Sequence, residues 1–210
     1  MARLQLALDG TLADSQRILA AVGSLVDIVE IGTPLIYREG IHAAHALRPY
    51  APSQSLLADL KIMDAGEYEA YIAFEAGCDW VTIMGVAHDD TIRGALAAAH
   101  QTGKQVAIDL IEVANPLERA RHLLAMGAHL LCVHTGTDRQ QHDSPLTVLR
   151  LLREALPDAP LAAAGGIKLA TLDAVLAFRP EVVVVGSAIT VAPDPAAAAR
   201  ALREKLEHDR

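Results

Sequence analysis

Short apolar segments alternate with longer amphipathic ones along the whole 210-residue chain. Eight of the apolar segments have the length and composition of buried strands: 4–8, 26–31, 55–60, 80–83, 106–110, 130–133, 161–164 and 182–185. Each is followed by a stretch long enough for a helix, for example 89–101, 116–126 and 195–207. The pattern therefore predicts repeated βα units built around a parallel sheet.

The units repeat at intervals of roughly 25 residues, and two of their predicted helices are followed by a glycine. Gly77 and Gly127 follow two of the predicted helices, where glycine readily adopts the left-handed cap conformation. Eight units in a chain of this length favour a closed (β/α)₈ barrel that spans residues 1–210 as a single domain. The alternative is an open doubly wound sheet, which calls for a G-x-G-x-x-G turn after the first strand. Residues 9–12 read Asp-Gly-Thr-Leu and lack that pattern.

The composition restricts the fold, the partners and the cellular location that we expect of this chain. Hydrophobic residues make up 52% of the chain and aromatic residues only 3%, which suits a parallel sheet covered by Ala-rich helices. The formal net charge is −8 with no basic run, so we expect no nucleic-acid partner. No segment resembles a signal peptide or a membrane span, so we expect no membrane partner and a cytoplasmic location.

Charged residues stand at the ends of otherwise apolar strands. They are Asp9, Glu30, Asp59 with Lys61, Asp109 and His134. In a barrel these positions meet at the carboxyl-terminal mouth, where active sites of this fold are built. A single carboxylate after a strand is often only a helix cap, but a charge after so many strands predicts a functional site.

Glycine-containing turns follow the last two predicted strands. Gly165-Gly166 and Gly186-Ser187 each precede a segment that can begin a helix. Small residues there let backbone N–H groups approach an anion, so the two turns together predict a phosphate site.

The carboxylates of the mouth, with Asp64 among them, repel one another unless cations lie between them. Lys61 supplies one positive charge, and a hard divalent ion with oxygen ligands would supply more. Mg²⁺ fits because it commonly takes only one or two carboxylates and leaves positions for substrate oxygens. A lysine and a metal beside a sugar oxygen would stabilise an enediolate, and a histidine can move the proton.

Several of these residues also form recognisable motifs. Residues 59–64, Asp-Leu-Lys-Ile-Met-Asp, match the D-x-K-x-x-D motif of the orotidine monophosphate decarboxylase suprafamily. The segments 7–9, 29–33, 134–138 and 164–167 follow in the expected order, and the resemblance extends from residue 4 to about residue 203. The chain most resembles the 3-hexulose-6-phosphate synthases, which have the 3-keto-L-gulonate-6-phosphate decarboxylases as a sister family.

This resemblance implies a role for each motif residue. Glu30 and Asp59 would lie at Mg²⁺, and Lys61 would face the enediolate. His134 is the first candidate for the base that carries the proton, and Asp109 is the second. Asp9 would orient Lys61 and substrate hydroxyls. The remaining roles are substrate or phosphate binding by Gly165, Gly166, Gly186, Ser187 and Thr137, and a contribution from Asp64 to the neighbouring site of a homodimer.

Three positions distinguish the two sister families. The decarboxylases resemble this chain except for Arg, Glu and Arg where Thr137, Asp109 and Ser187 stand. The resemblance therefore favours the aldol condensation of formaldehyde with D-ribulose 5-phosphate over the decarboxylation. One departure is that residues 138–144 form a shorter loop than we expect of a synthase.

Two further alternatives stay open at this point. A non-catalytic sugar-phosphate sensor would keep the glycine turns but would be expected to lose the charged cluster, whereas this chain has both. A ribulose-phosphate 3-epimerase would call for several histidines at strand ends, where only His134 stands.

Overall fold

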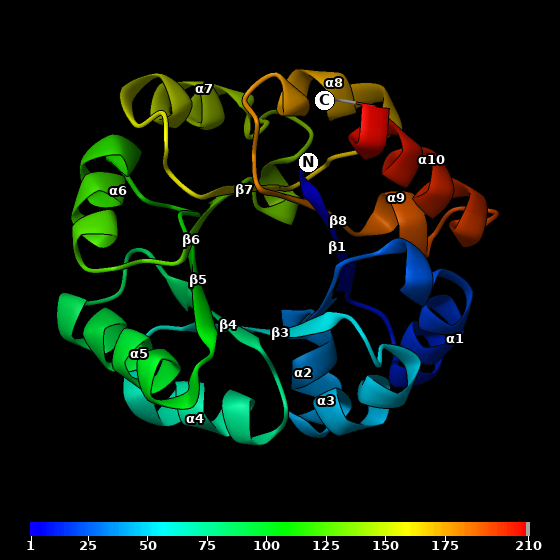
Figure 1. The fold of residues 1–210 in the computed structure, drawn as a ribbon, viewed down its shortest axis with the longest axis horizontal. Coiled ribbons are helices and arrows are strands. Elements are labelled where there is room, and N and C mark those ends of the chain that lie inside the picture. The colour runs from blue at the N-terminus through cyan, green and yellow to red at the C-terminus, as the bar shows by residue number, and fades with distance from the viewer. Residues whose placement is uncertain (209–210) are drawn as a thin grey trace.

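The computed structural model describes residues 1–208 and contains a closed barrel of parallel strands in chain order. Figure 1 looks down this barrel, with the strands inside a ring of helices. The strands are β1 (Arg3–Leu8), β2 (Ile28–Ile31), β3 (Ser55–Ile62), β4 (Trp80–Met84), β5 (Gln105–Asp109), β6 (Leu130–His134), β7 (Leu161–Ala164) and β8 (Val182–Val185). Because β1 pairs with β8, the barrel prediction is confirmed and the open-sheet alternative is wrong.

Helices connect the strands and cover the outside of the barrel (Figure 1). They are α1 (Leu12–Val22), α2 (Thr33–Glu39), α3 (His42–Leu47), α4 (Gly66–Glu75), α5 (Asp89–Thr102), α6 (Pro116–Ala125), α7 (Leu146–Ala155), α8 (Leu169–Leu176), α9 (Ser187–Thr190) and α10 (Pro195–His208). Short 3₁₀ turns are η1 (Gly23–Leu25), η2 (Arg48–Tyr50) and η3 (Thr137–Arg139). None of the helices in residues 1–208 is both long and apolar enough to cross a membrane.

Every predicted strand is present, but two of them differ from the prediction by more than one residue. β2 begins at Ile28 rather than at residue 26, and β3 continues to Ile62 rather than ending at residue 60. The longer β3 contains a shift in its pairing with β4 between Ala58 and Ile62. Such a bulge depends on the pairing with the partner strand, so the pattern of apolar residues in β3 alone does not predict it. The predicted caps are confirmed, since Gly77 and Gly127 have φ angles of 90° and 92°.

The hydrophobic core forms two layers, one between strands and helices and one inside the barrel. The inner layer contains Ile28, Leu57, Trp80, Leu130 and Val182, each at most 3% exposed. Most of these residues stand at the amino ends of their strands and fill that end of the barrel. The interior is therefore closed at the amino end, and any cavity must open at the carboxyl ends of the strands.

At the amino end, a side chain just before each of three even-numbered strands accepts a backbone N–H from the preceding strand. The three bonds are Leu4 N–H to Asp27 Oδ2 (2.7 Å), Leu56 N–H to Asp79 Oδ2 (2.9 Å) and Val106 N–H to His129 Nδ1 (3.3 Å). Each satisfies a donor at the start of a strand that would otherwise be left unpaired. The same hydrogen bond thus recurs once in every two βα units, between β1 and β2, β3 and β4, and β5 and β6.

Asp79 is the most highly connected of these three side chains. Its carboxylate also pairs with Arg48 (3.0 Å) and Lys104 (2.7 Å). Replacing it in Asp79→Ala should lower the free energy of unfolding by about 1–3 kcal/mol, because a strand N–H and two cations lose their acceptor. Chemical denaturation measures this change, with Asp158→Ala as the control because Asp158 is exposed and has no hydrogen bond recorded within residues 1–208.

The stabilisation by Asp79 should depend on pH. Partial burial alone would raise the pKa of the Asp79 carboxyl, but hydrogen bonds from Lys104, Leu56 and Arg48 outweigh burial and lower it. A lowered folded-state pKa means that the stabilisation is present above the unfolded value of about 4 and is lost as the pH falls through the folded value. The difference between wild type and Asp79→Ala should therefore be larger at pH 7 than at pH 3, and an unchanged difference would contradict this account.

Candidate active site

A cavity of about 490 Å³ lies at the carboxyl ends of the strands. Its walls come from all eight strands and from the turns that follow several of them. All the predicted site residues line it except Asp64: Asp9, Glu30, Asp59, Lys61, Asp109, His134, Thr137, Gly165, Gly166, Gly186 and Ser187. The barrel thus brings together side chains and turns that are far apart in the sequence, as the strand-end pattern predicted.

Lys61 lies between two acidic side chains. Its Nζ is 2.9 Å from Asp59 Oδ2 and 3.4 Å from Asp109 Oδ2. Burial alone would lower the pKa of the Lys61 ammonium, but the carboxylates of Asp59 and Asp109 outweigh burial and raise it. Lys61 is therefore a fixed positive charge in the cavity, which can stabilise negative charge on a ligand but cannot readily act as a base.

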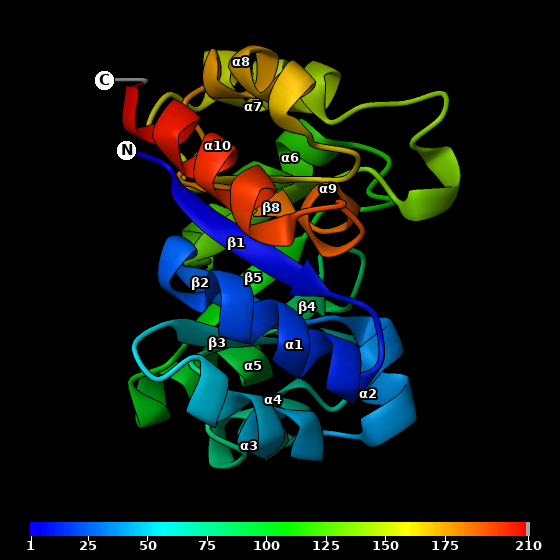
Figure 2. The same cartoon turned by 90° about the vertical axis from the view of Figure 1, so that its right-hand side faces the viewer.

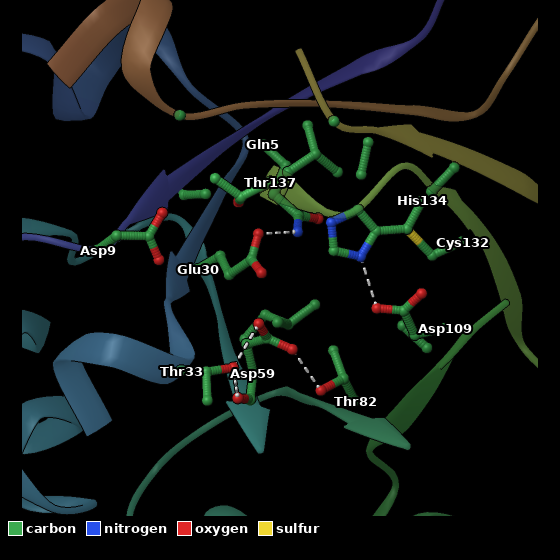
Figure 3. Close-up of a pocket in the computed structure, with 18 of the residues that line it drawn as sticks. Gln5, Asp9, Glu30, Thr33, Asp59, Thr82, Asp109, Cys132, His134 and Thr137 are labelled. Atoms are coloured by element: carbon green, nitrogen blue, oxygen red, sulfur yellow. Dashed lines mark hydrogen bonds and ion pairs between the residues drawn. The ribbon is translucent and has the colours of Figure 1, made fainter. Parts of the chain in front are cut away.

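Glu30 stands on β2 and points into the same space as Asp59 (Figure 3). Its Oε2 accepts a hydrogen bond of 2.7 Å from Gln5 Nε2. Burial, reinforced by the negative charge of Asp59, raises the pKa of the Glu30 carboxyl to about 8. A buried carboxyl that faces another carboxylate in this way favours a cation in its vicinity.

Asp109 and His134 form a hydrogen-bonded pair across β5 and β6 (Figure 3). The His134 Nδ1 lies 2.8 Å from Asp109 Oδ2, and Asp109 Oδ1 accepts the backbone N–H of Ile111 at 2.9 Å. Burial alone would raise the pKa of the Asp109 carboxyl, but the hydrogen bond and charge of His134, together with Lys61, lower it. A carboxylate at Nδ1 leaves Nε2 as the imidazole atom that can exchange a proton with a ligand.

Asp9 lies at the cavity wall, and within residues 1–208 no hydrogen bond or ion pair between Asp9 and Lys61 is recorded. The Nζ of Lys61 bonds to Asp59 and Asp109, whereas the Asp9 carboxylate lies against Gly32, where a Cβ would collide with its Oδ1. β3 and β5 thus supply the acceptors that Lys61 contacts, and the role of Asp9 in orienting Lys61 and substrate hydroxyls stays a prediction. Burial, reinforced by Asp59, raises the pKa of the Asp9 carboxyl.

The two glycine turns face the cavity after β7 and β8. Gly165 has a φ of 100°, and a Cβ at this position would collide with the carbonyl oxygen of Thr135, so both conformation and space require glycine. Within residues 1–208, no hydrogen bond is recorded for the backbone N–H groups of Gly166 and Ser187. These donors can bind an anion, as a phosphate site requires.

Asp64 is the one predicted site residue outside the cavity. It is exposed, and its Oδ1 accepts the backbone N–H of Ala65 (2.8 Å) just before α4. The exposed apolar side chains of Met63 and Tyr68 stand beside it in the chain, 52% and 70% accessible. A contribution of Asp64 to the site of a second subunit, and the homodimer itself, stay predictions.

Among the cavity residues that the sequence analysis missed, three hydrogen-bond to the acidic side chains of Glu30 or Asp59: Gln5, Thr33 and Thr82. Gln5 and Thr82 lie within strands, and Thr33 begins α2. They bond to Glu30 or Asp59 rather than carrying charge themselves. Polar residues at inward-facing strand positions, such as Gln5 between Leu4 and Leu6, were the signal that could have identified two of them.

The side chains present fit Mg²⁺. Glu30 and Asp59 are 9% and 6% exposed and face one space, and Glu30 Oε1 has no hydrogen bond recorded within residues 1–208. Asp59 is more heavily engaged, because Thr33, Lys61 and Thr82 all donate to its oxygens. No group of three or more His, Cys, Asp or Glu side chains in residues 1–208 forms a protein cage for a metal. One or two carboxylates with open positions is the donor set that Mg²⁺ commonly uses.

Known proteins resemble this chain over nearly its full length. A 3-hexulose-6-phosphate synthase 3 from Staphylococcus saprophyticus is 44% identical over 206 residues, which cover 97% of this chain and 98% of that protein. The crystal structure of 3-hexulose-6-phosphate synthase from Salmonella typhimurium superposes with a TM-score of 0.96 at 42% identity, covering 99% of this chain and 100% of that one.

A second kind of enzyme shares the fold at lower identity. The structure of 3-keto-L-gulonate-6-phosphate decarboxylase from Vibrio cholerae superposes with a TM-score of 0.88 at 27% identity, covering 100% of this chain and 99% of that one. Residues 2–202 match the family described as orotidine 5'-phosphate decarboxylase / HUMPS. With a family match over most of its length and relatives above 40% identity, the chain belongs to the orotidine 5'-phosphate decarboxylase / HUMPS family.

Proposed function

We propose that this protein is an aldehyde-lyase that condenses formaldehyde with D-ribulose 5-phosphate to D-arabino-3-hexulose 6-phosphate, and catalyses the reverse cleavage. The main observation behind the proposal is the set of groups that line one cavity: a lysine held between two carboxylates, an imidazole paired with a carboxylate, and two glycine turns. The names of the relatives above 40% identity support the same reaction.

The substrate is held at its phosphate. The turns after β7 and β8 offer backbone N–H donors from Gly166 and Ser187. With the phosphate there, the sugar carbons extend across the cavity toward Lys61 and His134. Thr137 also lines the cavity, and as a short side chain it leaves room for the phosphate end of the substrate.

Proton transfer begins the reaction. The neutral imidazole of His134 removes a proton from C1 through Nε2, and the electron pair of that C–H bond moves toward the C2 carbonyl oxygen to give an enediolate. C1 then attacks the carbon of formaldehyde, forming the new C–C bond, and the formaldehyde oxygen takes the proton back from His134. Asp109 holds Nδ1 throughout and, with its lowered pKa, is the partner of the base rather than the base.

Lys61 stabilises the enediolate, because its fixed positive charge faces the oxygen on which negative charge develops. Glu30 and Asp59 would hold Mg²⁺, which when bound would supply further positive charge next to the substrate oxygens. The oxygens of Asp59 are shared with Thr33 and Thr82, so these hydroxyls fix the direction in which the carboxylate points.

The test is formaldehyde consumption by the purified protein with D-ribulose 5-phosphate, measured with Mg²⁺ and again after chelation with EDTA. We expect consumption with Mg²⁺, at least a tenfold loss after chelation, and recovery when Mg²⁺ is restored, because without the metal the substrate oxygens lose its positive charge. Full activity in EDTA would contradict the metal.

Two further measurements, CO₂ release and ribulose 5-phosphate binding, separate the alternatives. Absence of formaldehyde consumption together with CO₂ release from 3-keto-L-gulonate 6-phosphate would assign the decarboxylase reaction of the sister enzymes. Absence of both reactions, with binding of ribulose 5-phosphate retained, would instead indicate a sugar-phosphate sensor.

A further inference from the structure

The strand that carries Asp59 and Lys61 departs from regular pairing at those residues. Ala58 on β3 is paired with Val81 on β4, and the next pair joins Ile62 to Ile83. β3 therefore uses more residues than β4 between the two pairs, so residues 59–61 form a bulge. A bulge leaves backbone groups without their usual partners on the neighbouring strand.

The bulge also places Lys61 in an uncommon backbone conformation. Its φ is 49°, in the left-handed region that residues with a side chain seldom occupy. Such a conformation persists only where surrounding contacts hold it. Here the backbone N–H of Lys61 donates a hydrogen bond of 2.9 Å to the hydroxyl of Thr82, the residue of β4 that lies between the two regular pairs.

The same hydroxyl also contacts the other functional residue of the bulge. Thr82 Oγ1 donates a hydrogen bond of 2.7 Å to Oδ1 of Asp59 (Figure 3). A hydroxyl has one hydrogen to donate and lone pairs that accept, so both bonds can exist at once. Thr82 is 7% exposed, which leaves little access for water to replace either bond.

We propose that Thr82 is a positioning residue of the active site: its hydroxyl fixes the backbone of Lys61 and the carboxylate of Asp59 in one arrangement, and so directs the Lys61 ammonium toward the substrate. The inference rests on the proposed function, because it takes Lys61 as the group that stabilises charge on the substrate. It assigns Thr82 no contact with the substrate.

The experiment compares two substitutions that separate the hydroxyl from the volume of the side chain. Thr82→Val keeps the shape and removes the hydroxyl, whereas Thr82→Ser keeps the hydroxyl and removes a methyl group. In Thr82→Val we expect kcat to fall about 10- to 100-fold, with KM for ribulose 5-phosphate changed less than about threefold, because the phosphate turns lie on β7 and β8. In Thr82→Ser we expect kcat within about threefold of wild type.

A second measurement does not depend on turnover. The amide of Lys61 should be protected from hydrogen exchange in the wild type and in Thr82→Ser, and should exchange at least about tenfold faster in Thr82→Val. If the wild type consumes no formaldehyde, the proposed function fails, and the exchange of this amide still tests the position of Thr82. Should Thr82→Val not fold, Thr82→Ala removes the same hydroxyl with less bulk.

The outcomes are distinct. An active wild type with an equally active Thr82→Val would overturn the proposal, as would equal protection of the Lys61 amide in both proteins. A Thr82→Ser protein as impaired as Thr82→Val would also overturn it, because the methyl group and not the hydroxyl would then matter. Loss in the valine variant with recovery in the serine variant supports it.

Discussion

Replacing Lys61 by alanine should lower kcat for formaldehyde condensation by at least about 10²–10³-fold, the usual cost of removing a preorganised group that stabilises developing charge. Its Nζ lies 2.9 Å from Asp59 and 3.4 Å from Asp109, so it is held in place before substrate arrives. The charge that it stabilises exists only after the C1 proton has left, and KM should therefore change much less than kcat. Steady-state kinetics at several ribulose 5-phosphate concentrations separate the two parameters.

Two matched variants accompany this measurement. Lys205→Ala removes a lysine of α10 that pairs with Asp173 outside the cavity, and it should leave kcat unchanged. Lys61→Arg retains the positive charge, but the guanidinium is larger than the ammonium and places its charge differently between Asp59 and Asp109, so kcat should still fall at least about tenfold. A Lys61→Ala protein that is folded by circular dichroism and turns over like the wild type would remove Lys61 from the mechanism.

The sequence predicts the fold well because the barrel is specified by local patterns. Every apolar segment of strand length became a strand, and β7 and β8 have the predicted bounds. The prediction is poorer at β3, which continues to Ile62 through a bulge. That bulge is stabilised by the hydroxyl of Thr82, a residue 21 positions from Lys61, and no local pattern records such a contact.

For the site, charge at strand ends was sufficient to find the charged side chains of the cavity, because the carboxyl ends of parallel strands in a barrel converge. Which partner each side chain contacts was less predictable. Lys61 bonds to Asp59 and Asp109 rather than to Asp9, since this choice depends on how β1, β3 and β5 are placed around the barrel. Gln5 was missed because the prediction relied on charge at strand ends, whereas Gln5 is uncharged and lies inside β1.

The side view in Figure 2 shows on which side of the barrel β1 ends and the segment between β6 and α7 lies. The arrow of β1 points to the side where the segment between β6 and α7 extends away from the barrel, while the beginning of β1 and the end of α10 lie on the opposite side. Gln140, in that segment, lines the cavity and donates a 3.3 Å hydrogen bond to the carbonyl of Thr135. The segment thus borders the cavity beside Gly166.

Replacing His134 by asparagine should lower kcat by about 10²–10⁴-fold, the range for loss of a general base. Asparagine can still place a polar atom near Asp109, so the variant removes the proton carrier and keeps the packing at the end of β6. The most direct measurement is exchange of the C1 proton of ribulose 5-phosphate with D₂O in the absence of formaldehyde, followed by NMR. The wild type should exchange this proton, and His134→Asn should not, because exchange requires only proton removal and not C–C bond formation.

The control is His100→Asn, since His100 is exposed on α5 and does not line the cavity. It should exchange the C1 proton as the wild type does. Undiminished exchange in His134→Asn would transfer the role of base to another group, and Asp109→Ala would then be the variant expected to abolish exchange. If His134 is the base, Asp109→Ala should instead slow exchange without abolishing it, because the imidazole remains but loses the carboxylate that orients Nδ1. The two variants together therefore assign the base to one member of the pair and the orienting role to the other.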